Sequence, residues 1–140
     1  YEIMPSLVGS EMCIRDRSRI DILLEDTDIG RCWIEIKNVH LRRDHLGSKG
    51  LAEFPDSVTA RGSRHINNLV DQLKMGDRSI LVFVIQRMDC IDFKIAKDID
   101  PLYYQTLQRG IEAGLEVLCF DTDISLSSIS LRDPVPFSAH

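Results

Sequence analysis

The 140-residue sequence has no long apolar segment. Its longest unbroken apolar run covers residues 80–85, whereas a membrane-spanning helix needs ~20 such residues. The first residues also lack the basic start and the long apolar stretch of a secretory peptide. The sequence therefore predicts neither a membrane contact nor a targeting signal.

Cysteine is scarce and scattered. The four cysteines are Cys13, Cys32, Cys90 and Cys119, and they do not show the paired spacing of a zinc site. Two of them lie in apolar segments that read as strands. We therefore expect buried thiols in a reducing cytoplasm rather than disulfides or metal ligands.

Basic residues are fewer than acidic ones: the chain has 17 Lys and Arg and 22 Asp and Glu, which gives a net charge of −5. This sign argues against indiscriminate binding to nucleic acid. Residues 37–64 reverse the balance with six basic residues against three acidic ones. The six are Lys37, Arg42, Arg43, Lys49, Arg61 and Arg64. Such a cationic band can mark a polyanion site, and an ordinary solvated loop explains the same charges equally well.

Residues 1–17 stand apart because they show no hydrophobic period. Residues 12–16, when back-translated, resemble the end of a transposon adapter used in sequencing libraries, and residues 1–10 resemble a longer form of the same contaminant. We interpret residues 1–17 as an adapter-derived, disordered artefact. A natural N-terminus is the alternative. Residues 18–140 have the length of one domain.

Hydrophobic periodicity predicts a hairpin and two helices. Alternation predicts strands at 19–25 and 32–41, joined by a turn-rich loop. Helical spacing of apolar residues predicts a helix at 64–75. Asp100 and Pro101 have the positions of an N-cap and a first helical residue, which predicts a second helix at 101–113.

Further apolar segments predict the rest of the sheet. Residues 79–86 and 115–120 are apolar on both faces and therefore read as buried strands, whereas residues 124–131 read as an edge strand. Residues 42–56 read as a polar loop. Strands that alternate with helices in this order predict parallel crossovers. The fold class that follows is α/β, a mixed sheet with flanking helices.

The hairpin brings acidic residues together. Strand side chains alternate between faces, so Glu35 and Lys37 point the same way, and Asp21 lies opposite Glu35 if the hairpin turns near Asp28. Opposed carboxylates repel each other, and a divalent cation between them removes that cost. Magnesium, or manganese in its place, suits such carboxylates together with water and phosphate oxygens. We predict Asp21 and Glu35 as metal ligands and Lys37 as the residue that positions water or steadies a phosphate.

The same residues also fit the solvated outer face of a half-buried hairpin, because a motif of three residues is weakly specific. Charged side chains in an otherwise apolar strand, beside Trp33 and Ile36, cost folding free energy unless they are paired or bind a ligand. This cost favours a functional site.

Asp21, followed after thirteen residues by Glu35-x-Lys37, resembles the PD-(D/E)xK nuclease core. Longer blocks extend the resemblance in order, at residues 18–21, 34–39, 54–62, 83–87 and 99–101. Together they are similar to the C-terminal half of the sugar fermentation stimulation protein A family. The resemblance covers residue 18 to about residue 137.

This resemblance implies a restriction-endonuclease-like core in a prokaryotic DNA-binding protein linked to the regulation of sugar metabolism. It also implies that residues 18–140 are the nuclease-like C-terminal domain and that the family's N-terminal OB-like domain is missing here. By motif, Asp21, Glu35 and Lys37 take the catalytic positions. Ala60 stands where family members usually have Glu, which puts any role of that carboxylate in doubt.

The contacts with nucleic acid are expected from the basic band and the second signature block, namely Lys49, Arg61, Arg64 and His65. His65, at the start of a helix, is expected to face a phosphate there. Accessory roles are expected for Asp56 in that block and for Gln86 and Arg87, which end a central strand.

We therefore predict a cytoplasmic, DNA-binding protein with a magnesium-dependent nuclease-like site. The first alternative is a regulator that binds DNA and keeps a vestigial metal or phosphate site without turnover. The second is an interaction domain whose charged strand face is solvated surface. The sequence does not fix the oligomeric state.

Overall fold

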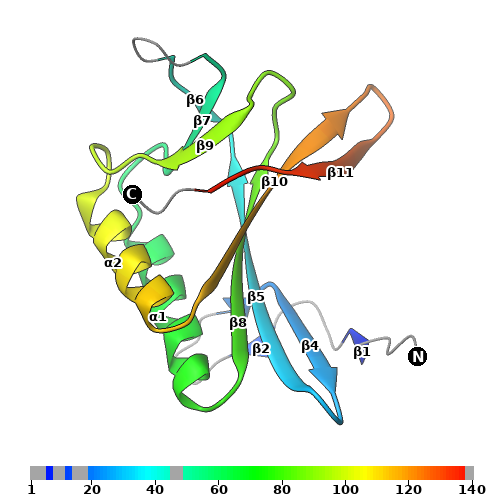
Figure 1. Cartoon of the computed structure of the whole chain (residues 1–140), viewed down its shortest axis with the longest axis vertical. Helices are drawn as coiled ribbons and strands as arrows, with labels where there is room; N and C mark the ends of the chain where they lie inside the picture. Colours follow the sequence, from blue (N-terminus) through cyan, green and yellow to red (C-terminus); the bar gives the residue numbers. More distant parts are fainter. Residues whose placement is uncertain (1–5, 8–11, 14–18, 45–48, 138–140) are drawn as a thin grey trace.

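A six-stranded mixed sheet forms the centre of the computed structural model, which describes residues 6–7, 12–13, 19–44 and 49–137. Helices α1 (Ala60–Lys74) and α2 (Pro101–Glu112) lie together on one side of this sheet (Figure 1). The strands, in spatial order, are β1 (Ser6–Leu7), β4 (Ile22–Asp26), β5 (Gly30–Val39), β8 (Arg78–Ile85), β10 (Glu116–Ile124) and β11 (Ile129–Pro134). The predicted α/β class is confirmed.

The hairpin has the register that the sequence predicts. Strand β4 pairs antiparallel with β5, and the pairs Ile22↔Ile34 and Asp26↔Gly30 place the turn at Asp28. Strands β5, β8 and β10 run parallel to one another, which confirms the predicted crossovers. Strand β11 pairs with β10 at the edge of the sheet.

The core lies between the sheet and the helices. On β5, Trp33, Glu35 and Val39 are buried and alternate with half-buried Ile34 and Ile36. The next strand supplies Leu81 and Phe83, and α1 supplies Ile66 and Leu69, all of them within the same buried cluster. One face of β5 therefore packs beneath α1, and Glu35 is on that face.

The first strand is broken where the sequence predicts a continuous one. A bend at Asp21 separates β3 (Arg19–Ile20) from β4. The bend changes the alternation, so that Ile20 and Leu23 are both buried while Ile22 is half-buried. Strand β3 pairs with β2 (Met12–Cys13) in a separate two-stranded sheet.

A third sheet takes one of its strands, β7 (Leu51–Phe54), from the predicted loop at residues 42–56, which corrects that prediction. It consists of β6 (Leu41–Arg42), β7 and β9 (Asp92–Ile95). These strands have two to four residues and are too short for an alternation pattern to reveal them. Ion pairs brace this sheet, because Arg42 contacts Asp44 and Asp89, and Arg43 contacts Glu53 and Asp98.

Helix α1 begins at Ala60, four residues before its predicted start at residue 64. Thr59 is the N-cap, and its hydroxyl accepts a hydrogen bond from the N–H of Gly62 at 3.0 Å. The first turn, residues 60–63, has no large apolar side chain, so the apolar spacing used to find the helix does not reach it. Helix α2 begins at Pro101 after the Asp100 N-cap, as predicted.

The expectation of buried thiols is met at Cys32, Cys90 and Cys119, which are free and buried, while the side chain of Cys13 lies outside the described residues. Among the helices of the described residues, none is long and apolar enough to cross a membrane.

Asp100 links the starts of both helices. Its Oδ1 accepts the N–H of Tyr103 in α2 at 2.9 Å, and its Oδ2 accepts the N–H of Thr59, the cap of α1, at 2.8 Å. The side chain is buried, so both amides have exchanged water for this one carboxylate. The relative position of the two helix N-termini therefore depends on Asp100.

We expect Asp100→Ala to lower the free energy of unfolding by about 1–3 kcal/mol, because it removes an N-cap and leaves buried N–H groups unpaired. Urea unfolding at pH 7 measures this change. Asp71→Ala is the matched control, since Asp71 is on the surface of α1 and pairs there with exposed Lys74. Equal, small effects of the two substitutions would contradict the linking role.

Candidate functional site

Glu35 is a buried carboxylate in the middle of a central strand. Only 2 % of the residue is exposed, and it lies on the face of β5 that packs beneath α1. An ionised carboxylate in such a place is costly unless it is paired and hydrogen-bonded. The partners of Glu35 therefore define the site.

Two side chains converge on one oxygen of Glu35. Lys37, two residues along the strand and on the same face, donates to Oε1 from Nζ at 2.7 Å. His65, from the first half of α1, also contacts Oε1 through Nδ1. The other oxygen, Oε2, is buried and has no hydrogen-bond partner among the described residues. The carboxylate is therefore held on one side and left unsatisfied on the other.

His65 is itself hydrogen-bonded by a residue at the surface of α1. Its ring is buried, and its Nε2 accepts a hydrogen bond from Nε of Arg61 at 3.3 Å, one helical turn earlier. Lys37 Nζ lies 3.1 Å from Nδ1 of the same ring. Arg61, His65, Glu35 and Lys37 thus form a continuous polar cluster between the surface of α1 and the centre of β5.

These contacts govern the ionisation of Glu35. Burial raises the pKa of Glu35, but the hydrogen bonds from His65 and Lys37 and the positive charge of Lys37 act against burial and leave the pKa below the ordinary value for glutamate. Glu35 is therefore ionised at neutral pH, as a metal ligand must be.

Asp21 lies beside this cluster at the bend between β3 and β4. The paired register ends at Ile22↔Ile34, one residue short of Asp21 and Glu35, so the predicted opposition of the two carboxylates stays a prediction. Its side chain is exposed, and its Oδ2 accepts the backbone N–H of Ile36 at 2.8 Å. Asp21 is thereby fixed next to Glu35 along the strand, through the backbone of β5.

The donor set suits a hard divalent cation. Among the described residues, no three His, Cys, Asp or Glu side chains come together as a metal site. Two carboxylates are nevertheless sufficient for magnesium, which keeps several of its waters and takes further oxygens from phosphate. The unsatisfied Oε2 of Glu35 is an acceptor that such a cation would satisfy. Asp21 and Glu35 therefore fit the predicted metal.

The other predicted residues are distributed over the surface. Arg64 is exposed on α1, near Arg61. Lys49 precedes β7 and Asp56 follows it, and both are exposed. Among the described side chains, only the hydroxyl of the adjacent Ser57 donates a hydrogen bond to the Asp56 carboxylate.

Gln86 and Arg87 follow the end of β8. The backbone N–H of Gln86 pairs with the carbonyl of Val39. Arg87 is engaged by Asp89 and by the carbonyl of His40. The contacts of these two residues are with the far end of β5 and the loop after β8, rather than with Glu35. Their accessory roles stay predictions.

Sequence reasoning missed the partnership of His65 with Glu35. Arg61 and His65 are four residues apart and would share one helix face, but the predicted helix began at residue 64 and excluded Arg61. The expected phosphate contact of His65 stays a prediction, and its observed partners are Arg61, Glu35 and Lys37.

Tyr103 is a second residue with a buried, unsatisfied polar atom. It is fully buried in α2, and its hydroxyl has no hydrogen-bond partner among the described residues. Burial raises the pKa of Tyr103, and the negative charges of Glu35 and Asp100 raise it further. Tyr103 therefore donates to no described acceptor but lies within the electrostatic field of Glu35.

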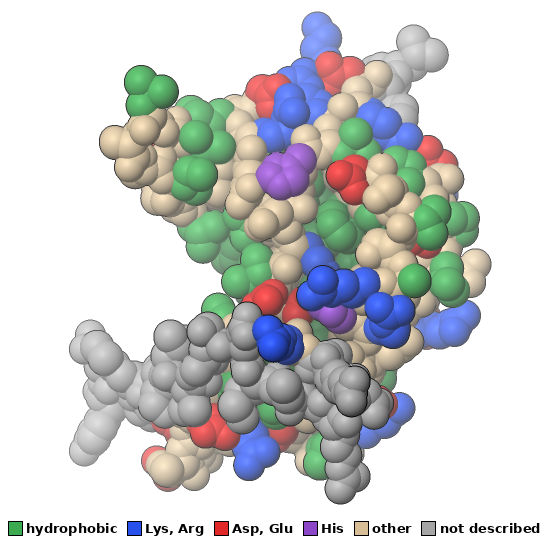
Figure 2. All heavy atoms as spheres, turned by 180° about the vertical axis from the view of Figure 1, so that it is seen from behind, with side chains coloured by type: hydrophobic (Ala, Val, Ile, Leu, Met, Phe, Trp, Pro, Cys, Tyr) green, Lys and Arg blue, Asp and Glu red, His purple; other side chains and the backbone are tan. Residues whose placement is uncertain are grey.

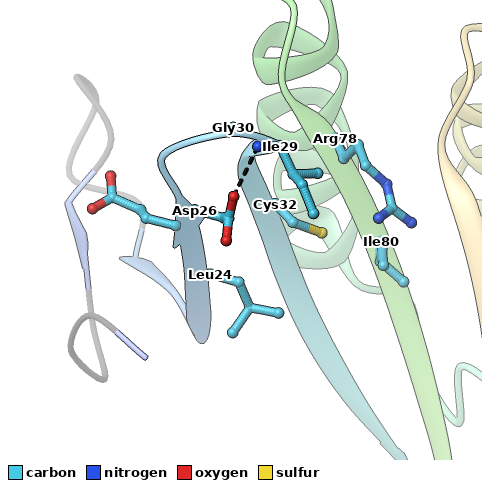
Figure 3. Close-up of a pocket in the computed structure, with 8 residues that line it drawn as sticks. Leu24, Asp26, Ile29, Gly30, Cys32, Arg78 and Ile80 are labelled. Carbon is cyan, nitrogen blue, oxygen red and sulfur yellow. Dashed lines mark hydrogen bonds between the residues drawn. The ribbon is translucent and has the colours of Figure 1, made fainter. Parts of the chain in front are cut away.

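A separate pocket of about 230 Å³ lies near the turn of the β4–β5 hairpin (Figure 3). Leu24, Cys32 and Ile80 line it, and Arg78 stands at its side. These strand residues alternate with the buried residues Leu23, Trp33 and Leu81, so the pocket is on the face of the sheet opposite Glu35. It does not belong to the candidate site.

Residues 4–128 match the family described as "Sugar fermentation stimulation protein RE domain". The chain belongs to this family. A sugar fermentation stimulation protein homolog of Maricaulis maris is 42% identical over 120 residues, which are 86% of this chain and 49% of that protein. The homolog of Brucella ovis is 41% identical over 139 residues, covering 96% of this chain and 57% of that protein. The chain thus spans about half the length of these curated relatives.

A solved structure shows the same fold. It is titled "The structure of Pyrococcus Furiosus SfsA in complex with Ca2+", and it matches 94% of this chain and 55% of its own with a TM-score of 0.82 and 28% sequence identity. The resemblance drawn from the sequence is confirmed. The matched family range begins at residue 4, and β1 and β2 lie within residues 1–17. The adapter origin of that segment stays a prediction.

We expect Lys37→Met to lower the free energy of unfolding by about 1.5–3 kcal/mol, because Glu35 then loses a charged hydrogen-bond donor. Urea unfolding at pH 7 measures the change. Lys74→Met is the matched control, since its pair with Asp71 is exposed and such pairs contribute about 0–1 kcal/mol. If the two variants are equally stable, Lys37 does not compensate the buried charge.

Proposed function

We propose that this chain is the DNA-binding, nuclease-like part of a sugar fermentation stimulation protein and that it hydrolyses phosphodiester bonds with Mg²⁺ or Mn²⁺. The observation that carries the proposal is the arrangement around Glu35, a buried, ionised carboxylate with one oxygen held by Lys37 and His65 and the other unsatisfied. Such an arrangement costs stability and provides a ligand for a cation.

Asp21 and Glu35 would hold the cation. When bound, the cation would lower the pKa of a water molecule and neutralise charge on a phosphate. The Pyrococcus furiosus relative is titled as a complex with Ca²⁺, and Ca²⁺ and Mg²⁺ share the preference for oxygen ligands. This likeness supports a hard divalent cation as the ligand that this chain would bind.

Lys37 is suited to act on the reacting groups. Its ammonium is fixed by Glu35 at the edge of the buried cluster, and its side chain is 14% exposed. An ammonium in this position can donate to a water molecule or to a phosphate oxygen, and it stabilises negative charge that develops there. Its proximity to Glu35 keeps this charge at the site before substrate arrives.

DNA would approach over the first turns of α1. Figure 2 shows basic side chains beside a histidine and acidic side chains in the middle of one face of the molecule. Arg61 and Arg64 are the exposed basic residues of this helix segment. Arg42 and Arg43 are engaged in ion pairs of the third sheet. The contact with DNA is therefore narrow rather than a broad basic surface.

The second candidate function is a DNA-binding regulator that does not cleave. The observation that favours it is that Lys37 and Arg61 are engaged within the cluster, by Glu35 and His65. Ala60, where a family glutamate usually stands, removes one further carboxylate from the same helix start. The three free, buried cysteines support a cytoplasmic location for either function.

The two functions are separated by a cleavage assay of this chain on linear DNA with Mg²⁺, with Mn²⁺ and with EDTA. We expect cleavage that requires the cation and is abolished by Asp21→Asn and by Lys37→Ala, because the first loses a ligand and the second the donor at the reacting phosphate. Asp28→Asn, at the exposed turn of the same hairpin, is the matched control. Binding without cleavage under all conditions would support the regulator instead.

Binding to DNA should depend on salt. We expect the logarithm of affinity to fall linearly with the logarithm of salt concentration and Arg64→Ala to reduce the slope by about 0.9, because one phosphate contact is lost. Fluorescence anisotropy at several salt concentrations measures the slope. Arg109→Ala, on the exposed surface of α2, should leave it unchanged. A salt-independent affinity would rule out the phosphate contacts.

A further inference from the structure

The contact between Arg61 and His65 fixes where the histidine carries its proton. A guanidinium has only donors, so Nε of Arg61 must donate, and Nε2 of His65 must accept. A neutral imidazole that accepts at one nitrogen has its hydrogen at the other. His65 therefore carries its proton on Nδ1, the atom that faces Oε1 of Glu35.

The same assignment explains the crowded contacts at this atom. An Nδ1–H group donates to the carboxylate, so it cannot also accept from Lys37. Lys37 Nζ, although 3.1 Å from Nδ1, donates to Oε1 of Glu35 at 2.7 Å instead. Both donors thus end on one oxygen.

We infer that Arg61 and His65 are positioning residues that decide which oxygen of Glu35 is presented to the cation. Arg61 and the Glu35 carboxylate both require the hydrogen of His65 on Nδ1, and His65 with Lys37 occupies Oε1. Oε2 is left as the free acceptor. The cation itself rests on the proposed function, whereas the tautomer and the orientation of Glu35 do not.

A carboxylate needs such a device because its two oxygens are chemically equivalent. A Glu35 held only by Lys37 could present either oxygen, and a ligand in the wrong orientation loses affinity. Hydrogen-bond partners of metal-ligating carboxylates fix this orientation, and their removal typically lowers metal affinity or activity by 10–100-fold. His65 is 6% exposed, so it is placed to support Glu35 rather than to meet a substrate.

Arg61, unlike the buried His65, is exposed to solvent, so its role as a positioning residue must be separated from a contact with DNA. Its side chain is on the surface of α1, where it could be read as a simple DNA contact. Its hydrogen bond to Nε2 of His65 gives it a second effect that is present without DNA. Measurements on the chain with cation alone therefore isolate that effect.

The test combines nitrogen-15 NMR of the His65 ring with calorimetric titration of Ca²⁺, both without DNA. The wild-type chain should show hydrogen on Nδ1 only, and Arg61→Ala, which removes the donor at Nε2, should make a second form with hydrogen on Nε2 detectable. His65→Leu should weaken Ca²⁺ binding 10–100-fold. His65→Asn, whose amide can still donate to Glu35, should recover most of the loss. Asn67→Ala, exposed on the same helix, should change neither measurement.

The outcomes separate this inference from the proposed function. Hydrogen on Nε2, or on both nitrogens, in the wild type would overturn the inference whatever the cation does. Ca²⁺ affinities that are equal in the wild type and His65→Leu would also overturn it. A wild-type chain that binds no Ca²⁺ would overturn the proposed metal site and the presenting role, and an Nδ1–H tautomer would then support only the Arg61–His65 contact. Circular dichroism of each variant shows whether the substitution has unfolded the chain.

Discussion

The burial of the Glu35 carboxylate constrains the elements around it. A charge inside a central strand is tolerated only with close partners, because desolvation costs several kcal/mol per ion. Lys37 supplies one partner from the same face of β5, and His65 supplies the other from α1. Helix α1 must therefore cross this strand with its first turns above Glu35, and the caps that fix those turns contribute to the site as well as to stability.

The contacts of Asp100 and of the arginines extend this dependence through the fold. Asp100 joins the starts of α1 and α2, and thus holds the helix that carries Arg61 and His65. The cationic band read from the sequence separates into two groups. Arg42 and Arg43 brace the third sheet through acidic partners, whereas Arg61 and Arg64 lie on α1. Arginines of the same cationic band therefore have different roles, one pair in the fold and the other on the surface of α1.

Local pattern was sufficient for much of the fold. The alternation around Asp28 predicted the hairpin register, and Asp100-Pro101 predicted the start of α2, because both signals lie within a few residues of the structure that they determine. The start of α1 and the third sheet were missed. The first turn of α1 has no large apolar side chain, and Thr59 and Asp100 fix where it begins. The short strands β7 and β9 pair across some 40 positions of sequence, so no local pattern reveals them.

The same division holds for the candidate site. The sequence by itself determined the α/β class, the family, and the neighbouring placement of Asp21, Glu35 and Lys37, since strand alternation and motif spacing are local properties. Only the tertiary structure decided that Glu35 faces the helix side, that His65 and Arg61 support it, and that Asp21 binds the backbone at Ile36. The contacts of Asp21 with Ile36 and of His65 with Glu35 join residues 15 and 30 positions apart, and they form only when the bend at Asp21 and the packing of α1 on β5 bring these residues together.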